Sequence, residues 1–386
     1  MQISQYRKSM LSCAFFFSGP GMIYGLFTSR LPAITDKTGA QPKDVGLILL
    51  AVGLASLVSL FTSPYIIRRL SSRVILPSVM PLALLTLPLL AMCTHVWQLM
   101  LAAIPYGFLL ALLDASINTQ GIIIEQKYGR RCMSSLHAFY GIGGIAAAGL
   151  ASAFAHFSQG PMVNFVSVII CYALFIPLAT KNLVPDREIV PEGHDAVRRG
   201  RLTGLPFMVY LCGFITLCAY IVEGSVGEWG SIYMYNNKHA PESVAALVYG
   251  TFYVTSVVVR LFADRLTERL KDYVICCVGA MLGGFAMTMI IQIDNTTACL
   301  IFYALLGVGM APIVPLMFSR AGSLPDVNPA DASAVVAIFG YSGLLLYPPF
   351  LGYVAQWTGL DQALQIIVVL CLVLVFTSVM LKRGRC

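Results

Sequence analysis

Charged residues are scarce in this chain of 386 residues. Asp, Glu, Lys and Arg make up 11% of it, against roughly a quarter in soluble globular domains, and 58% of the residues are apolar. A soluble core cannot bury so large an apolar fraction, whereas a lipid bilayer can accommodate it. The composition therefore excludes an ordinary soluble protein and indicates an integral membrane protein.

Several sequence signatures of chemistry are also missing. The chain has no GxxxxGK[S/T] phosphate loop, no HExxH motif, no paired His and Cys at metal-binding spacing, and no Ser with His and Asp near one membrane interface. The eleven cysteines form no Cys-x-x-Cys pair, so we interpret them as small hydrophobic side chains. We therefore expect no cofactor, no metal, no use of ATP and no enzymatic activity.

Long apolar runs are what the sequence does contain. A transmembrane helix needs about 20 mainly apolar residues, and twelve runs meet that condition. Their limits are 9–29, 45–67, 74–94, 97–124, 133–157, 161–181, 205–233, 243–263, 273–293, 297–319, 331–355 and 362–381. The first run is too long for the apolar region of a signal peptide, so we retain it as a span. The predicted fold class is an all-α membrane protein with twelve transmembrane helices.

Lys and Arg are distributed unevenly between alternate loops, which indicates the orientation of the spans. One set of loops and termini holds Arg7, Lys8, Arg68, Arg69, Arg73, Lys127, Arg130, Arg131, Lys181, Arg187, Arg198, Arg199, Arg201, Arg260, Arg265, Arg269, Lys271, Arg320, Lys382, Arg383 and Arg385. The other set holds Arg30, Lys37, Lys43 and Lys238. Because basic loops stay in the cytoplasm, both termini are predicted to be cytoplasmic. The same rule explains the basic loops without a nucleic-acid partner.

The longest polar stretch of the chain separates two sets of six spans. The predicted domains are an N-terminal six-helix bundle over 1–181, a cytoplasmic linker over 182–204 and a C-terminal six-helix bundle over 205–386. The linker is rich in charged residues and contains two prolines, a composition typical of a connection outside the membrane.

The two predicted bundles share short sequence matches. The residues 69–73 align with 265–269 at an offset of 196 positions, and Phe139 and Gly143 align with Phe339 and Gly343 at an offset of 200. Nearly equal offsets on corresponding helices indicate a duplicated six-helix unit.

Twelve spans, a charged central loop and a basic loop after the second span of each half resemble the major facilitator superfamily over the whole chain. Its loop signature resembles G-x-x-x-D-R-x-G-R, which the second half matches best, from Arg260 to Leu266. The first half has Arg68 where the acidic residue falls, so the resemblance does not extend to the acid-to-helix-end contact in that half. It implies two bundles in a pseudo-two-fold arrangement that rock around a central cavity.

Several strings resemble the fucose-permease-related branch of that superfamily and its bacterial inner-membrane members of the YbjJ type. They are Leu113–Gly121, Met133–His137, Gly141–Gly144, Val222–Ser225 with Glu228 and Trp229, and Gly340–Gly343 followed by Pro348 and Pro349. The resemblance implies a permease in a bacterial inner membrane, with a sugar or a similar small polar metabolite as its substrate.

Polar residues inside a membrane span are costly unless they face protein or water, so they are candidates for function. In the fourth span Asp114, Asn118, Gly121 and Glu125 recur at helical spacing on one face. We predict that Asp114 carries protons, because a buried carboxyl group can alternate between charged and neutral forms. Asn118 and Gln120 are predicted to bind substrate, and hydrogen bonding between helices is the alternative.

In the fifth span His137 and Tyr140 share a face with Gly141 and Gly144. Both His137 and Tyr140 are predicted to contact substrate, although packing is an equal alternative for the histidine. The glycines of this span are predicted to allow close approach of a neighbouring helix.

The seventh span carries Glu223, Glu228 and Trp229 among several glycines. The glycines weaken the helix, so we expect a break of the kind that lines transporter sites. Glu223 is predicted to bind substrate and to carry protons. Glu228 and Trp229 are predicted to bind a sugar through carboxylate acceptors and ring stacking, with a place near the periplasmic interface as the alternative. Weaker candidates of the same kind are Tyr253, Tyr341 and Tyr347.

Charged residues at the span ends have a different predicted task. The cytoplasmic gate is predicted to consist of Arg69, Arg73, Asp264, Arg265 and Arg269, whose charge pairs would break as the halves rock. The alternative is that they only set the orientation of the chain. Arg30, after the first run, is interpreted as an interfacial anchor, with contact to an anionic group as its alternative.

Together these features predict a monomeric secondary transporter that moves a sugar, polyol or similar small polar metabolite by alternating access, in symport with protons. A proton-driven exporter of drugs or metabolites is the first alternative and would have a more apolar cavity rich in Met and Phe. A non-transporting membrane receptor or assembly component is the second, which the altered loop at Arg68 favours. The polar residues Asn118, Gln120 and His137 favour the polar substrate.

Overall fold

The computed structural model describes residues 2–129, 132–186, 204–322, 324, 327 and 329–384. Twelve of its helical segments are long and apolar enough to cross a membrane. The protein is therefore an all-α, multi-pass membrane protein, which confirms the predicted fold class. Of the predicted linker over 182–204, residues 187–203 lie outside the described part of the chain.

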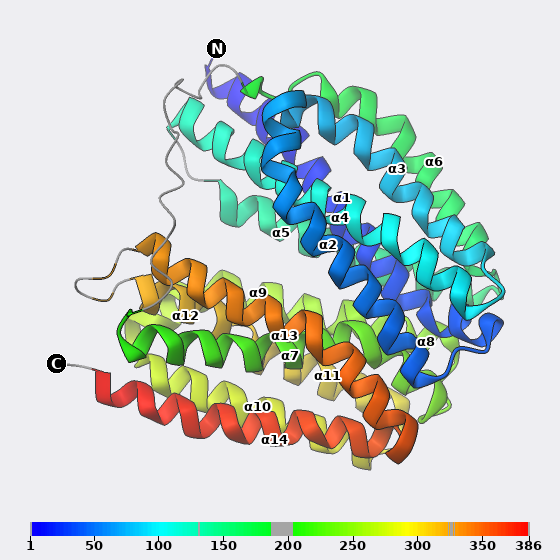
Figure 1. Ribbon diagram of the computed structural model, residues 1–386, viewed down its shortest axis with the longest axis vertical. Helices are drawn as coiled ribbons and strands as arrows, with labels where there is room; N and C mark the ends of the chain where they lie inside the picture. The colour runs from blue at the N-terminus through cyan, green and yellow to red at the C-terminus, as the bar shows by residue number, and fades with distance from the viewer. Residues whose placement is uncertain are drawn as a thin grey trace. The chain divides into compact units, whose positions relative to one another are not determined.

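The helices follow one another with short connections (Figure 1). The first six are α1 (Gln2–Thr38), α2 (Pro42–Leu70), α3 (Ser72–Met92), α4 (Val96–Tyr128), α5 (Met133–His156) and α6 (Pro161–Thr180). The next four are α7 (Phe207–Asn236), α8 (Glu242–Ala245), α9 (Leu247–Arg269) and α10 (Asp272–Gln292). The last are α11 (Thr296–Met310), α12 (Ile313–Gly322), α13 (Pro329–Thr358) and α14 (Leu360–Met380), followed by a 3₁₀ turn over Leu381–Gly384.

The chain forms two compact units. Unit 1 comprises Met1–Gly193 and Pro241–Gly250, and unit 2 comprises His194–Ala240 and Thr251–Cys386. The short helix α8 and the start of α9 therefore pack with the first unit, although they follow α7 in the chain.

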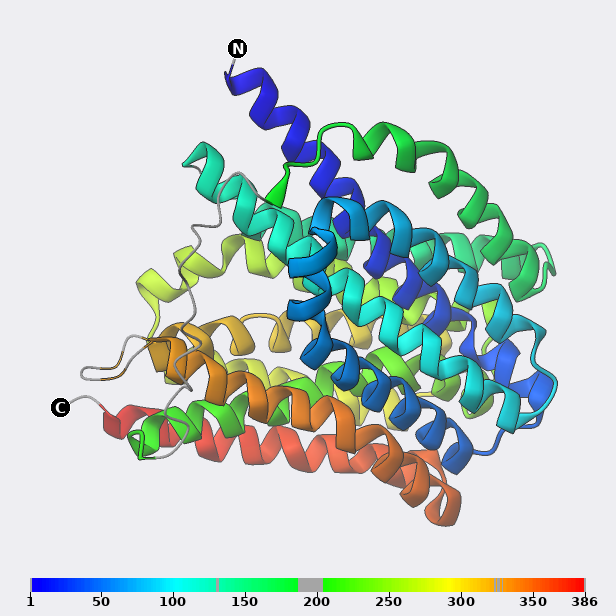
Figure 2. The same cartoon turned by 45° about the horizontal axis from the view of Figure 1, so that its top comes forward.

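The two units pair their helices in the same way. In unit 1, α1 packs on α5 and α3 packs on α6, while in unit 2, α7 packs on α13 and α10 packs on α14. The pairs α3 with α6 and α10 with α14 lie side by side in both views (Figure 1 and Figure 2). Because these helices occupy the same places in the order of each half, their pairing supports the duplication that the sequence indicates.

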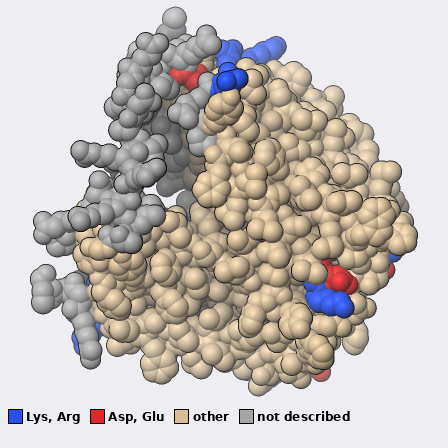
Figure 3. Space-filling view, viewed as in Figure 1, with Lys and Arg blue, Asp and Glu red and all other residues tan. Residues whose placement is uncertain are grey.

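Charged side chains are scarce on the face shown in Figure 3, where Lys, Arg, Asp and Glu occur in a few small groups. Large apolar side chains such as Phe61, Leu174 and Phe376 are instead more than 70% exposed, at 84%, 72% and 73%. A soluble protein rarely exposes so many large apolar groups, but a bilayer solvates them.

A close contact between two helices repeats in the two units at an offset of 200 positions. Ser56 Oγ donates to Gly107 O at 3.0 Å, and Ser256 Oγ donates to Gly307 O at 3.4 Å. At both glycines an added Cβ would collide with a carbonyl of the facing helix, that of Val52 or of Phe252. Glycine is therefore required for the close approach of α2 to α4 and of α9 to α11.

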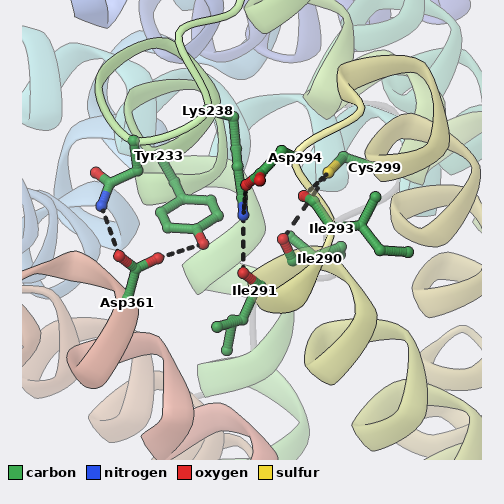
Figure 4. Close-up of polar contacts among 9 residues, drawn as sticks. Tyr233, Lys238, Ile290, Ile291, Ile293, Asp294, Cys299 and Asp361 are labelled. Atoms are coloured by element: carbon green, nitrogen blue, oxygen red, sulfur yellow. Dashed lines mark hydrogen bonds and ion pairs between the residues drawn. The ribbon is translucent and has the colours of Figure 1, made fainter.

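Lys238 holds together one end of unit 2 (Figure 4). Its Nζ donates to Ile291 O at 2.7 Å, lies 3.5 Å from the Asp294 carboxylate and stands 5.6 Å from the ring centroid of Tyr233. Tyr233 in turn donates to Asp361 Oδ1 at 2.6 Å. These bonds join the end of α7 to the end of α10 and the start of α14.

Unit 1 contains the counterpart of the lysine contact. Lys37 Nζ donates to Ala91 O at 2.7 Å, joining the end of α1 to the end of α3. Lys37 precedes Lys238 by 201 positions and Ala91 precedes Ile291 by 200, so this contact also follows the repeat.

The predicted break in the seventh span is wrong. α7 is continuous from Phe207 to Asn236 despite its glycines, because packing against α13 and α14 outweighs their weak helix propensity. The interruption lies in the tenth span, where α11 ends at Met310 and α12 begins at Ile313. Pro312 lies in the gap, and a proline has no N–H with which to continue the helical bonding.

Candidate functional site

An ion pair lies among the membrane-spanning helices of unit 2. Glu223 on α7 is 9% exposed, and its Oε1 lies 3.2 Å from Nη2 of Arg260 on α9, whose side chain is 38% exposed. Arg260 Nε also donates to Ala311 O, at 3.2 Å. We call these three residues the Glu223 centre.

The Glu223 centre includes the interruption of the tenth span. The carbonyl of Ala311 lies where α11 gives way to α12, and helix ends leave carbonyl groups without helical partners. Arg260 satisfies this carbonyl and neutralises Glu223 with the same guanidinium. One arginine thus connects α7, α9 and the α11–α12 junction.

Tyrosines flank the Glu223 centre on α7 and α13. Tyr220, one turn before Glu223, has its ring centroid 6.3 Å from that of Tyr341. Gly340 allows this approach, because an added Cβ would lie 2.5 Å from Cδ2 of Tyr220. Tyr341 itself is 50% exposed. Tyr220 thus links two predicted residues: it lies one turn from Glu223 on α7 and packs against Tyr341 on α13.

Three polar atoms on the packed helices α7 and α13 are buried without a bond. Within the described residues, Glu228 Oε2, Trp229 Nε1 and Tyr347 Oη have no hydrogen-bond partner. Buried polar atoms usually have a hydrogen-bond partner, so these three atoms remain able to bond a polar group. Glu228 is 9% exposed and Trp229 is fully buried.

In unit 1, α4 presents two of the predicted residues on one face. Asn118 Nδ2 donates to the carbonyl of Asp114, one turn earlier, at 2.8 Å. Both side chains are half-buried. The bond holds the Asn118 amide against its own helix and beside Asp114, as the helical spacing predicts.

The fifth span places His137 and Tyr140 on α5 opposite α1. The ring of His137 lies 5.3 Å from that of Phe17 in an edge-on contact, and the histidine is exposed. Tyr140 is half-buried, and its carbonyl occupies the space where a Cβ at Gly21 would lie. Gly143 likewise abuts the carbonyl of Ser18. The predicted close helix approach is confirmed at Gly143 and Gly144, whereas a Cβ added at Gly149 would meet no atom within 4 Å.

Gln120 faces another part of unit 1. It is fully buried, and its Nε2 donates to Ser72 Oγ at 2.8 Å and to Val184 O at 2.7 Å. Its Oε1 accepts from Val184 N at 3.2 Å. These contacts correspond to the alternative of hydrogen bonding between helices, and the predicted substrate contact at Gln120 stays a prediction.

Asp186 completes the bonding at the start of α3. Its Oδ2 accepts from the backbone N–H of Ser72 at 2.7 Å, and its Oδ1 accepts from the hydroxyls of Ser71 and Ser72 at 2.8 Å each. A carboxylate at a helix N-terminus is stabilised by the unpaired N–H groups and by the helix dipole. The first half thus obtains its acidic helix-end contact from Asp186.

Replacing Asp186 by asparagine should lower the free energy of unfolding by about 1–2 kcal/mol, because the amide supplies one acceptor where the carboxylate supplies two. The matched control is Asp36→Asn, since Asp36 is exposed and its replacement should change stability much less. Thermal unfolding of the purified protein in detergent measures both. Equal melting temperatures for the two variants would contradict the assigned contact.

Arg30 is not an interfacial anchor. α1 continues to Thr38, and Arg30 lies inside it with no exposed surface. Its guanidinium donates to Ala151 O at 3.3 Å and to Gln159 O at 2.5 Å, and lies 3.2 Å from Glu242 Oε1. The alternative interpretation, contact with an anionic group, matches this ion pair.

The predicted gate residues are only partly described. Arg69 is exposed, with its guanidinium carbon 4.8 Å from the ring centroid of Tyr65, and Arg73 is half-buried. The side chains of Asp264, Arg265 and Arg269 lie outside the described part of the structure. A role for these residues in gating stays a prediction.

Arg260 is the residue that sequence reasoning missed. The distribution of Lys and Arg places it among the cytoplasmic loop residues, but it lies inside α9 and pairs with a buried glutamate. One signal was available: Arg260 occupies the first position of the loop signature, where the family pattern has glycine, at the end of an apolar run. A charge there needs a partner at membrane depth.

The twelve spans make the chain a polytopic membrane protein. The chain matches the family model of the Major Facilitator Superfamily over residues 10–348. The protein belongs to that superfamily, and it is a transporter rather than an enzyme.

Two relatives match nearly the whole chain. An uncharacterized transporter of the major facilitator type from Yersinia pestis is 27% identical over 372 residues, which is 96% of this chain and 94% of that protein. Membrane protein MosC from Rhizobium meliloti is 23% identical over 387 residues, 98% of this chain and 91% of that protein.

Solved structures share the fold. The crystal structure of the nucleoside transporter NupG has a TM-score of 0.76 at 14% identity, covering 97% of this chain and 99% of that one. A bacterial homologue of the human lysosomal transporter Spinster has a TM-score of 0.71 at 13% identity, covering 97% of this chain and 96% of that one. At these identities the likeness concerns the fold alone.

Proposed function

We propose that this protein is a monomeric proton symporter that carries a small, neutral, polar metabolite, of the sugar or polyol kind, across a bacterial inner membrane by alternating access. The Glu223 centre is the observation that supports the proposal most. Glu223 and Arg260 together carry no net charge, so an ionic substrate meets no uncompensated charge there. Hydroxyl groups, however, can donate to the carboxylate and accept from the guanidinium.

The unbonded polar atoms of α7 and α13 support a substrate that carries hydroxyl groups. Glu228 Oε2 can accept a hydroxyl hydrogen, while Trp229 Nε1 can donate to a hydroxyl oxygen and Tyr347 Oη can do either. Rearrangement of these buried groups around a polar ligand would satisfy them. We propose that Tyr341, on the same helix as Tyr347, takes part in this binding.

Proton coupling is proposed to involve Asp114 in unit 1 and Glu223 in unit 2. Protonation of Glu223 would remove the charge that Arg260 neutralises, and so would weaken the ion pair that joins α7 to α9. A change in proton occupancy can therefore alter how α7, α9 and the α11–α12 junction are held together.

In unit 1 the proposed substrate contacts are Asn118, Gln120, His137 and Tyr140. We further propose that both termini are cytoplasmic, as the distribution of Lys and Arg indicates. The gate on that side would then include Arg69 and Arg73 in one half, with Asp264, Arg265 and Arg269 in the other.

The substrate can be found by thermal unfolding of the purified protein against sugars, polyols, nucleosides, organic acids and lipophilic cations. Nucleosides belong in the panel because NupG, which shares the fold, transports them. A ligand at 100 times its Kd raises the free energy of unfolding by about 2.7 kcal/mol. We expect a sugar, polyol or similar neutral compound to stabilise the protein, and the effect to vanish in Glu223→Gln.

Uptake into vesicles tests the coupling. With the identified substrate, an inward proton gradient should accelerate uptake by the unmodified protein at least tenfold, and Asp114→Asn and Glu223→Gln should each lose that acceleration. Asp44→Asn is the matched control, because Asp44 only bonds the backbone at the start of α2. If both test variants transport normally without regard to pH, proton symport through these residues is wrong.

The alternatives predict other results in the same assays. Stabilisation by lipophilic cations alone would favour a proton-driven exporter. No stabilising ligand and no uptake of any compound would favour a receptor or assembly component that does not transport.

A further inference from the structure

The start of α3 and the start of α10 occupy equivalent positions in the two units. Ser71 and Ser72 in unit 1 correspond to Lys271 and Asp272 in unit 2, and Gln120 corresponds to Arg320, all at an offset of 200 positions. In unit 1 the Asp186 carboxylate lies at this position and accepts from both serines. The repeated architecture therefore holds an anion at the start of α3.

Unit 2 has a cavity at the equivalent position. Its volume is about 210 Å³, and it is lined by Lys271, Asp272, Tyr273, Arg320, Leu381 and Lys382. Arg320 Nη1 donates to Asp272 Oδ2 at 2.5 Å, and Nη2 donates to Leu381 O at 2.7 Å. Arg320 thus repeats the bonding of Gln120, which joins the start of α3 to Val184.

The cavity differs from its counterpart in charge. Asp186 follows Val184 by two positions in unit 1, whereas the residues that follow Leu381 are basic, beginning with Lys382. Three basic side chains and one carboxylate line the cavity. Since Asp272 already pairs with Arg320, the two exposed lysines, Lys271 and Lys382, face the cavity with a positive charge that no acidic lining residue balances.

The cavity lies where spans end. Asp272 begins the span over 272–292, and Lys382 follows the end of the span over 360–380. Span ends are at the level of lipid headgroups, where basic pockets between helices bind anionic lipids.

From this comparison of the two halves we propose that the cavity at the start of α10 binds a phosphate group, carried by the headgroup of an anionic lipid. Lys271 and Lys382 provide charge from two sides. The N-terminus of the long helix α10 lies at the cavity, and the acidic residue of its first turn, Asp272, is paired with Arg320. The phosphate would then join the ends of α10 and α14, as Asp186 joins α3 to the segment that follows α6.

Native mass spectrometry of the full-length protein, with phosphatidylglycerol as probe and phosphatidylcholine as reference, tests the proposal. The double variant K271Q/K382Q should bind phosphatidylglycerol at least tenfold more weakly than the unmodified protein. The matched control is K127Q/K181Q, which removes two exposed lysines at the ends of α4 and α6 in unit 1. Its affinity should stay within twofold of the unmodified protein.

Inorganic phosphate distinguishes the source of the group. One outcome is that inorganic phosphate displaces phosphatidylglycerol equally from the unmodified protein and from K127Q/K181Q, while K271Q/K382Q binds neither. In that case the cavity binds phosphate from either source. Binding of the lipid alone supports the headgroup. Equal loss of phosphatidylglycerol binding in both double variants, or loss in neither, would overturn the proposal. The exposed lysines make misfolding of K271Q/K382Q unexpected, and its melting temperature without lipid verifies this.

Discussion

Arg260→Met is expected to lower the free energy of unfolding by about 3 kcal/mol and to abolish transport. The substitution leaves the Glu223 carboxylate, which is 9% exposed, without its cation. It also leaves the carbonyl of Ala311 at the α11–α12 junction without its donor. An uncompensated buried charge is among the most destabilising changes a protein can undergo. Thermal unfolding in detergent and uptake into vesicles measure the two effects.

A matched control and a double variant isolate the ion pair. Arg7→Met removes an exposed arginine near the N-terminus and should change the free energy of unfolding by less than about 0.5 kcal/mol. Glu223→Gln combined with Arg260→Met should recover much of the lost stability, because neither charge is then left alone. Transport should stay absent in the double variant. A single Arg260→Met variant as stable as Arg7→Met would show that the pair contributes nothing.

Arg30→Met is the second large effect, with an expected loss of about 3–5 kcal/mol. Arg30 is fully buried, and its removal deprives the carbonyls of Ala151 and Gln159 of their donor and the carboxylate of Glu242 of its cation. We expect a lower melting temperature and a smaller yield of folded protein. Lys43→Met is the control, because Lys43 is exposed at the start of α2.

Arg30→Lys separates charge from geometry. Lysine keeps the positive charge. Its single ammonium group, however, cannot contact two carbonyls and a carboxylate that lie around the planar guanidinium of arginine. We expect it to lose more than half of the stability that Arg30→Met loses. Glu242→Gln should cost less than either, since the Glu242 side chain is 25% exposed and Arg30 keeps its two carbonyl acceptors. If Arg30→Lys matched the unmodified protein, charge alone would account for the site.

The class, the spans and the repeat follow from the sequence alone. Each of the twelve spans depends on the apolar character of about 20 consecutive residues, a local property that no tertiary contact changes. The face shared by Asp114 and Asn118 follows from helical spacing, and the close approach at Gly143 follows from the absence of a side chain. These features could therefore be predicted.

Only the tertiary structure decided which polar groups meet. Arg260 could be assigned to a loop from its sequence neighbours, but its pairing with Glu223 depends on how α9 packs beside α7. The same is true of Arg30 with Glu242, of Asp186 at the start of α3, and of the cavity at the start of α10. Even the position of the helix break was decided by a balance between glycine propensity and packing. A charged or polar side chain bonds the groups that lie within about 3 Å of it, and these come from helices far away in the sequence. The spacing of residues along the chain does not show which helices meet.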